Sequence, residues 1–271
     1  MATEQATCTF RALGFCGADD SVHPNMLAII SHAYPLVEFG VLFRPDKEGQ
    51  PRYASQAWVA RLSTVAKQTQ TTSGHPIKLA AHLCSTRVNE VLSGDVGFVQ
   101  QLQEWGFQRV QVNATAVNGV DTSRLAESPP DLVKVMESFP SIEFILQKNE
   151  ETRPLWEGVL QHEHGGVGRL PQNVTMLVDE SKGTGVTASS WPSPPEQYDI
   201  GYAGGIGPQN IRQVVQDVQR AAKGRPIWID MESSLRSDKN GKDVFDLDKC
   251  YEVIDAMCEL GFLQHPSFMR L

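Results

Sequence analysis

The sequence predicts a single α/β domain that folds as a (β/α)8 TIM barrel. Its 271 residues suit one such barrel, which typically takes about 250. Eight short apolar runs alternate along the chain with stretches of helical periodicity, which is the pattern of strands and helices in this fold. No Gly-x-Gly-x-x-Gly turn follows the first run, so the alternative, an open doubly wound sheet of the dinucleotide-binding type, has no local support.

Within the eight runs, apolar residues follow one another more than they alternate with polar residues, as expected of parallel strands covered by helices. In chain order, we predict strands over residues 8–16, 37–43, 77–84, 109–113, 142–147, 174–179, 199–203 and 227–231.

Helical stripes of apolar residues lie between these runs. One stripe consists of Ile211, Val214, Val215, Val218 and Ala222, another of Trp58, Leu62 and Val65, and a third of Tyr251, Ile254 and Met257. Pro24, Pro129 and Pro208 fall where first helical turns would begin, a position that tolerates proline. The sequence therefore predicts a helix after each strand.

The barrel is predicted to span residues 1–271, with loop insertions near 45–52, 162–172 and 181–197. The last of these follows the sixth strand and is long and rich in small residues. Long loops at the carboxyl ends of strands are where barrels place their chemistry.

The net charge of −8 argues against nucleic-acid and anionic-membrane partners, since both are bound through basic patches. No apolar run approaches the roughly 20 residues of a membrane span. The five cysteines include no CxxC pair, which indicates reduced thiols in a cytosolic protein. We therefore expect a cytoplasmic location; the oligomeric state is left open.

Two residues at predicted strand ends are candidates for chemistry. Cys16 ends the first strand, which places its thiol at the rim of the barrel mouth; the alternative is a small buried filler. Asp179 ends the sixth strand, where an acid must be paired, hydrogen-bonded or functional. Its alternative role is a cap or a loop-fixing acceptor.

Glycine and serine residues follow the last two strands. Gly204 and Gly205 come after the seventh, and Ser233 and Ser234 after the eighth. Because adjacent glycines expose backbone N–H groups, and because barrels bind phosphate with these two loops, we predict an anion site there.

The other candidates are weaker. Arg52 could clamp a carboxylate or phosphate, or be a solvated loop charge. The glycine-containing loop at 182–185 lacks the Walker spacing. His162 and His164 have no evident third ligand, so no metal is predicted.

Several segments, taken in order, resemble phosphoribosylanthranilate isomerase, a barrel enzyme of tryptophan biosynthesis. The similarity is collinear over nearly the whole chain. The matching segments are Phe15-Cys16-Gly17; Phe39–Phe43 with Pro51-Arg52-Tyr53; Asp179 with Gly183-Thr184-Gly185, Thr187 and Trp191; Ala203-Gly204-Gly205 with Pro208 and Asn210; and Asp230, Ser233-Ser234 and Gly241-Lys242-Asp243.

The resemblance implies a cofactor-free Amadori isomerisation of an aminoaldose phosphate to an aminoketose phosphate. Cys16 would be the general base, with a lowered thiol pKa, and Asp179 the general acid. A small phosphorylated sugar-type ligand is the implied partner. Its phosphate would be held by Gly204, Gly205, Ser233 and Ser234, and the rest of it by Arg52, Gln111, Gly183, Thr184 and Gly185.

The chain departs from the family pattern at three places. Gly14 replaces the lysine of Lys-Ile-Cys-Gly, Asn113 replaces the histidine of Gln-Leu-His-Gly, and Leu235 replaces the glycine of Ser-Ser-Gly. These changes favour a relative of altered specificity, or one that has lost activity. The alternatives are a divergent barrel that binds or converts another small phosphorylated metabolite, and a non-enzymatic scaffold that uses the extra loops.

Overall fold

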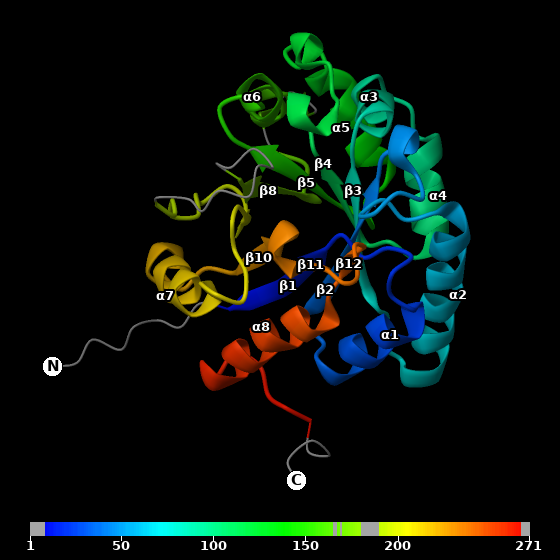
Figure 1. Cartoon of the computed structure of the whole chain (residues 1–271). Helices are drawn as coiled ribbons and strands as arrows, with labels where there is room; N and C mark the ends of the chain where they lie inside the picture. Colours follow the sequence, from blue (N-terminus) through cyan, green and yellow to red (C-terminus); the bar gives the residue numbers. More distant parts are fainter. Residues whose placement is uncertain (1–8, 165–166, 169, 180–189, 267–271) are drawn as a thin grey trace, which may run out of the picture.

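Eight parallel strands close into a barrel in a computed structural model that describes residues 9–164, 167–168, 170–179 and 190–266 (Figure 1). Neighbouring strands follow the order β1-β2-β3-β4-β5-β8-β9-β10, and β10 pairs with β1 to close the ring. The single-domain TIM barrel predicted from the sequence is confirmed.

Two of the predicted strands, at 37–43 and 227–231, have the predicted bounds, and the other six differ by one or two residues at their ends. The barrel strands are β1 (Phe10–Cys16), β2 (Val37–Phe43), β3 (Lys78–Leu83), β4 (Arg109–Val112), β5 (Glu143–Lys148), β8 (Val174–Val178), β9 (Ile200–Tyr202) and β10 (Ile227–Met231).

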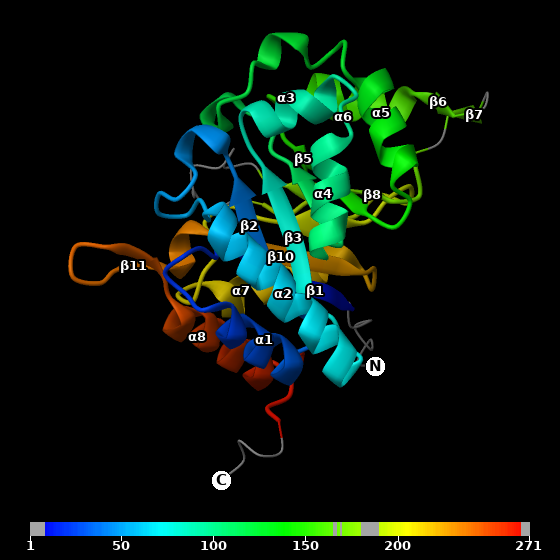
Figure 2. The same ribbon diagram turned by 90° about the vertical axis from the view of Figure 1, so that its right-hand side faces the viewer.

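Helices surround the barrel, and most of the apolar core lies between them and the strands (Figures 1 and 2). They are α1 (Pro24–Ala33), α2 (Gln56–Ser73), α3 (Thr86–Leu92), α4 (Gly97–Trp105), α5 (Pro129–Ser138), α6 (Arg153–Gln161), α7 (Ile211–Ala222) and α8 (Leu247–Glu259). The described residues between β8 and β9, 190–199, contain no helix, so the predicted helix after every strand is not found there. Pro24 and Pro129 open helices as predicted, but Pro208 lies in the turn before α7.

The loop insertions carry some regular structure. Residues 45–47 form a short 3₁₀ helix, η1 (Pro45–Lys47), and β6 (Glu163–His164) pairs antiparallel with β7 (Val167–Gly168). A further ribbon, β11 (Arg236–Asp238) with β12 (Asp243–Phe245), was not predicted. Figure 2 shows both ribbons projecting from the barrel. No helix in the described part of the chain has the length and apolar character needed to cross a membrane.

The amino-end opening of the barrel is closed by a network of ion pairs. The guanidinium of Arg109 on β4 donates to Glu38 on β2 at 2.8 Å and to Glu143 on β5 at 2.9 Å. Arg11 on β1 donates to Glu143 at 2.7 Å and to Asp199 at 3.0 Å. Glu38 and Arg109 are buried, and the pairing offsets the cost of removing their charges from water.

An apolar layer separates this network from the mouth. The Trp228 side chain fills the barrel centre together with Ala12, Ile145, Leu177 and Ala203. Its ring lies under the Arg109 guanidinium at 4.5 Å and against Gly201, where any Cβ would collide with it. The filled layer leaves the carboxyl-end mouth as the open end of the barrel.

Candidate functional site

A polar cavity of about 530 Å³ lies at the carboxyl-end mouth, within the volume range of small-molecule sites. Its floor includes His82, Gln111, Gln147, Asp179 and Asp230, which come from five different strands or strand ends. Its rim carries three cationic side chains, Arg44, Lys47 and Arg52. The mouth therefore combines groups that can transfer protons with cations that can attract an anionic ligand.

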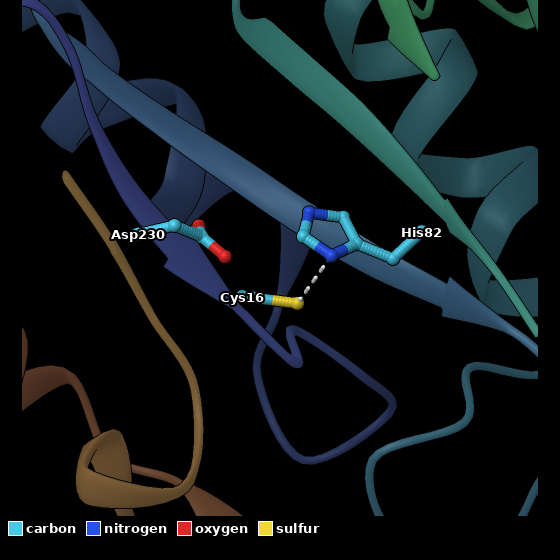
Figure 3. Close-up of side chains that lie close together, drawn as sticks. All are labelled: Cys16, His82 and Asp230. Atoms are coloured by element: carbon cyan, nitrogen blue, oxygen red, sulfur yellow. Dashed lines mark hydrogen bonds between the residues drawn. The ribbon is translucent and has the colours of Figure 1, made fainter. Parts of the chain in front are cut away.

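Cys16, His82 and Asp230 converge below this cavity (Figure 3). The Cys16 sulfur lies 3.3 Å from Nδ1 of His82, and one ligand atom from each of the three side chains lies within 4.8 Å of the others. His82 and Asp230 line the cavity, whereas Cys16 is only 1% exposed. Cys16 is thus at the strand end, as predicted, but buried under the rim.

Two glycines allow this convergence. Cys16 on β1 is in register with Gly40 on β2, and a Cβ at Gly40 would lie 2.8 Å from Nε2 of His82 and 2.9 Å from Cys16. Because Gly40 has no side chain, the β1 thiol and the β3 imidazole meet across β2. Gly14 pairs with Asp230, and a Cβ there would collide with the Asp230 carboxylate. Both glycines make room for functional groups.

Burial sets the protonation of this cluster. It raises the pKa of the Cys16 thiol well above its usual value, and the nearby Asp230 and Glu232 carboxylates raise it further. The lowered thiol pKa expected from the sequence is therefore wrong, because the cysteine is buried and its charged neighbours are acids. Burial, with the charge of Arg109, lowers the pKa of His82 to about 3, so the imidazole is neutral at physiological pH.

Burial also shifts the pKa values of two carboxyl groups near the cluster. Burial, with the charges of Glu38 and Glu232, raises the pKa of Asp230 well above its ordinary value. Burial also raises the pKa of Glu232, although the Arg52 guanidinium opposes it. Perturbed acids in a cleft are a mark of functional sites.

Asp179 follows β8 directly, is 5% exposed and faces the cavity. Its Oδ2 accepts a hydrogen bond of 2.8 Å from Nε2 of Gln147 on β5, which holds the carboxylate in place. The other amide atom, Gln147 Oε1, is buried and accepts no hydrogen bond from the described residues. A buried acceptor without a donor is uncommon in proteins, and this one belongs to a residue that lines the cavity.

Arg52 lines the cavity, but its side chain is engaged by the protein. Its guanidinium donates to Glu232 and Asp243, both at 3.3 Å, and to Ser233 Oγ at 3.1 Å. Its backbone has a left-handed φ of 77°, and its N–H donates to Asp19 at 2.6 Å. The loop is therefore fixed, which disfavours the alternative of a freely solvated charge.

The glycine and serine loops predicted to bind phosphate lie side by side in the mouth. Gly204, Gly205, Ser233 and Ser234 all line the cavity, and the Ser234 hydroxyl donates to the carbonyl of Ile206. Glu232 also lines this part of the cavity. A phosphate here would lie near that carboxylate, so Arg52 would have to offset the repulsion.

Gln111 lines the cavity from β4, and its Nε2 donates to Oδ1 of Asn113 at 2.7 Å. With Asn118 and Gln147, these residues give the cavity a wall of amides. The predicted substrate contacts Gly183, Thr184 and Gly185 lie outside the described residues.

Sequence reasoning missed several residues of the mouth. His82, Gln147 and Glu232 were not singled out, and Asp230 was noted only within the family motif. The available signal was the position of each residue along its strand, because every second side chain of a barrel strand points inward. His82 lies two residues before the end of the predicted third strand, and Gln147 ends the fifth. A polar residue at such a position must be satisfied inside the barrel.

No protein-family model and no curated protein matches the chain. Among solved structures, it is similar to the octameric Rubisco of Pyrococcus horikoshii OT3 (11% identity, TM-score 0.44), covering 83% of this chain and 54% of that chain. It is also similar to a Rubisco-like protein from Rhodopseudomonas palustris, with the same identity and TM-score, over 95% and 65% of the two chains.

A further similar structure is an enolase of the mandelate racemase subgroup from Agrobacterium tumefaciens, again at 11% identity and a TM-score of 0.44, covering 89% of this chain and 62% of that one. The chain thus spans a little over half to about two thirds of the length of these proteins. At this level the likeness is one of fold alone.

Proposed function

We propose that the barrel mouth catalyses a cofactor-free isomerisation of a small phosphorylated sugar amine, from aldose to ketose, as the resemblance to phosphoribosylanthranilate isomerase implies. The observation that carries the proposal is the convergence of proton-transferring groups under a cavity of substrate size. Cys16 with His82, Asp179 and Asp230 come from the ends of four strands, and the cavity rim is cationic.

The reaction divides between an acid and a base. Asp179 gives a proton to the ring oxygen, and the bond from that oxygen to C1 breaks as the substrate nitrogen forms an iminium bond to C1. Cys16 then removes the proton on C2, and the electron pair forms an enolamine. Return of a proton to C1 and loss of the proton on the C2 hydroxyl give the ketone. C1 is thereby reduced and C2 oxidised, with no external reductant.

The neighbours of the acid suit its role better than those of the base do. The Cys16 thiol must lose its own proton before it can accept one, but the raised pKa of the thiol and the lowered pKa of His82 oppose transfer of that proton across the 3.3 Å between them. The role of Cys16 therefore requires a bound substrate that reaches the buried thiol and changes its surroundings. Gln147 orients the Asp179 carboxylate. Its unused oxygen would accept a hydrogen bond from a substrate hydroxyl or N–H group, which would satisfy the buried acceptor.

A direct assay tests the proposal. Phosphoribosylanthranilate is fluorescent, and its loss is followed with time. We expect turnover by the native chain and a fall in rate of about 10²–10⁴-fold in Cys16→Ala and in Asp179→Asn, the range for one general acid or base. Cys84→Ser, which alters another buried thiol near the site, is the matched control and should retain the rate. Full turnover by Cys16→Ala would reject the assigned base.

A second candidate is a barrel that binds or converts a different small phosphorylated metabolite. Two features of the described residues favour it. Amide side chains form one wall of the cavity, and the Arg52 guanidinium is paired with Glu232 and Asp243, so it is less available to an aromatic carboxylate. The substrate that fits this wall has a polar, hydroxyl- or amide-bearing head.

Thermal shift distinguishes the second candidate. We expect ribose 5-phosphate to stabilise the protein by about 2.7 kcal/mol at a concentration 100 times its Kd, and inorganic phosphate at the same concentration to stabilise it less. In Gln147→Leu, ribose 5-phosphate should stabilise the protein no more than inorganic phosphate does. If no sugar phosphate stabilises the native chain, the second candidate fails.

A further inference from the structure

We propose that Cys16, His82 and Asp230 form a binding site for a zinc-class divalent metal ion, with an open coordination position toward the cavity. The proposal goes beyond the isomerisation and does not depend on it. Among the described residues this is the group whose sulfur, imidazole nitrogen and carboxylate oxygen come together within 4.8 Å. One thiolate, one imidazole and one carboxylate are all ligand types that Zn²⁺ accepts.

The geometry is close to that of a three-ligand site. On a tetrahedral zinc ion, ligand atoms lie about 3.4–3.6 Å apart, and the Cys16 sulfur and His82 Nδ1 are already 3.3 Å apart. Because the three ligand atoms lie within 4.8 Å of one another, the Asp230 carboxylate has to approach by about one ångström. Figure 3 shows it pointing toward the other two side chains, and Asp230 lines the cavity.

The backbone around the cluster is shaped for these three groups. Gly40 provides the space in which Cys16 and His82 meet, and Gly14 provides the space that the Asp230 carboxylate occupies. Both lie inside strands, where glycine weakens the sheet and often marks a close approach. Each glycine removes a side chain that would separate the ligands.

The charge of the mouth floor also suits a cation. Asp179, Asp230 and Glu232 face it. Two cations near this floor are already paired, Arg109 with Glu38 and Glu143, and Arg52 with Glu232 and Asp243. A divalent ion bound there would be attracted by the floor carboxylates in their ionised form.

Three protein ligands and one open position are the arrangement of catalytic, as opposed to structural, zinc sites. Because His82 and Asp230 line the cavity, a bound ion would present its open position to a ligand there. The same sulfur cannot hold a metal and act as a base. Metal binding and cofactor-free isomerisation are therefore alternative uses of Cys16, and a bound ion should switch the isomerisation off reversibly.

Cobalt substitution tests the site without any substrate. Metal-free, reduced protein is titrated anaerobically with Co²⁺ and followed by absorption. We expect one ion per chain, a near-ultraviolet sulfur-to-cobalt band and visible bands of tetrahedral intensity. Calorimetry with Zn²⁺ gives the affinity. His82→Gln and Asp230→Asn should each weaken Zn²⁺ binding by more than about 10-fold, since even outer-shell changes cost about 10–100-fold.

The cysteine variants supply matched controls. Cys16→Ser should abolish the sulfur band, whereas Cys84→Ser, which changes the other cysteine of the same small cluster, should keep it. Near-ultraviolet circular dichroism checks that each variant is folded. Absence of the band in the native chain, or its persistence in Cys16→Ser, would overturn the proposal.

The fluorescence assay with and without Zn²⁺ separates this proposal from the isomerase. Metal binding without any turnover rejects the isomerase alone. Turnover that Zn²⁺ leaves unchanged, with no cobalt band, rejects the metal site alone. We expect turnover that Zn²⁺ suppresses and a chelator restores.

Discussion

The two ends of the barrel hold titratable side chains in opposite states. At the amino end, Arg11, Glu38, Arg109 and Glu143 are joined in one network of ion pairs. At the carboxyl end, Asp179, Asp230 and Glu232 share the floor of a cavity with a thiol and a neutral imidazole. The pKa of Glu143 is lowered, whereas those of Asp230 and Glu232 are raised.

The difference shows which end is built for stability and which for chemistry. Breaking a buried ion pair by removing one partner is costly, and the amino-end network of such pairs ties β1, β2, β4 and β5 together. Acids that crowd one another oppose folding at neutral pH, and such arrangements are characteristic of functional sites. We therefore expect the crowded acids of the mouth to lower the stability of the fold, and a function at the mouth would explain why they are there.

The largest effect is expected at the amino end. Arg109→Met leaves Glu38, which is 5% exposed, without its partner, and we expect the free energy of unfolding to fall by about 3–5 kcal/mol. Denaturant titration measures it. The control Arg153→Met breaks exposed pairs with Glu150 and Glu157 and should change stability by less than about 1 kcal/mol. Equal effects of the two variants would remove the contrast between buried and exposed pairs.

A smaller effect is expected at a glycine of the mouth. Gly40→Ala places a methyl group between Cys16 and His82, and overpacking of this kind costs about 1–3 kcal/mol. It should also weaken Co²⁺ binding by separating the two ligands. Gly97→Ala is the control, because its methyl group would meet only the end of the Asp95 side chain at 3.3 Å. Unchanged stability and cobalt spectrum in Gly40→Ala would contradict the role given to this glycine.

The pH dependence of the unfolding free energy should further distinguish the amino end from the mouth. Burial would raise the pKa of Glu143, but Arg109 and Arg11 outweigh it and hold the pKa below 4.5. An acid with a lowered folded pKa stabilises the protein above its unfolded pKa, and this contribution is lost as the pH falls through the folded pKa. Glu143→Gln should therefore be less stable than the native chain at pH 7, with the difference shrinking below about pH 4.5. A stability difference between Glu143→Gln and the native chain that does not change with pH would contradict the pairing of Glu143 with the two arginines.

The fold could be predicted from the sequence because its signals are local. The runs at 37–43 and 227–231 are apolar and bounded by turn residues, so their bounds match β2 and β10. The ribbon of β11 and β12 was missed because its residues, Arg-Ser-Asp and Asp-Val-Phe, are mainly polar and read as a loop. The helix expected between β8 and β9 is not found in the described part of that connection.

The site was only partly predictable because it depends on register. Cys16 and Asp179 follow from their place at strand ends. The meeting of Cys16 with His82 requires that Gly40 lie opposite Cys16 on the strand between them, and pairing of that kind cannot be read along the chain. The raised pKa of Cys16 likewise depends on Asp230 and Glu232, which are more than 200 residues away in sequence.

The most direct test of the contrast between the two ends is the unfolding free energy of Asp230→Asn at pH 7, measured beside its Co²⁺ binding. Replacing a crowded carboxylate with a neutral amide of similar shape should leave the metal-free protein at least as stable as the native chain, while Co²⁺ binding is weakened by more than about 10-fold. A loss of several kcal/mol, like that expected for Arg109→Met, with Co²⁺ binding intact, would show that the acid serves the fold and would contradict the account.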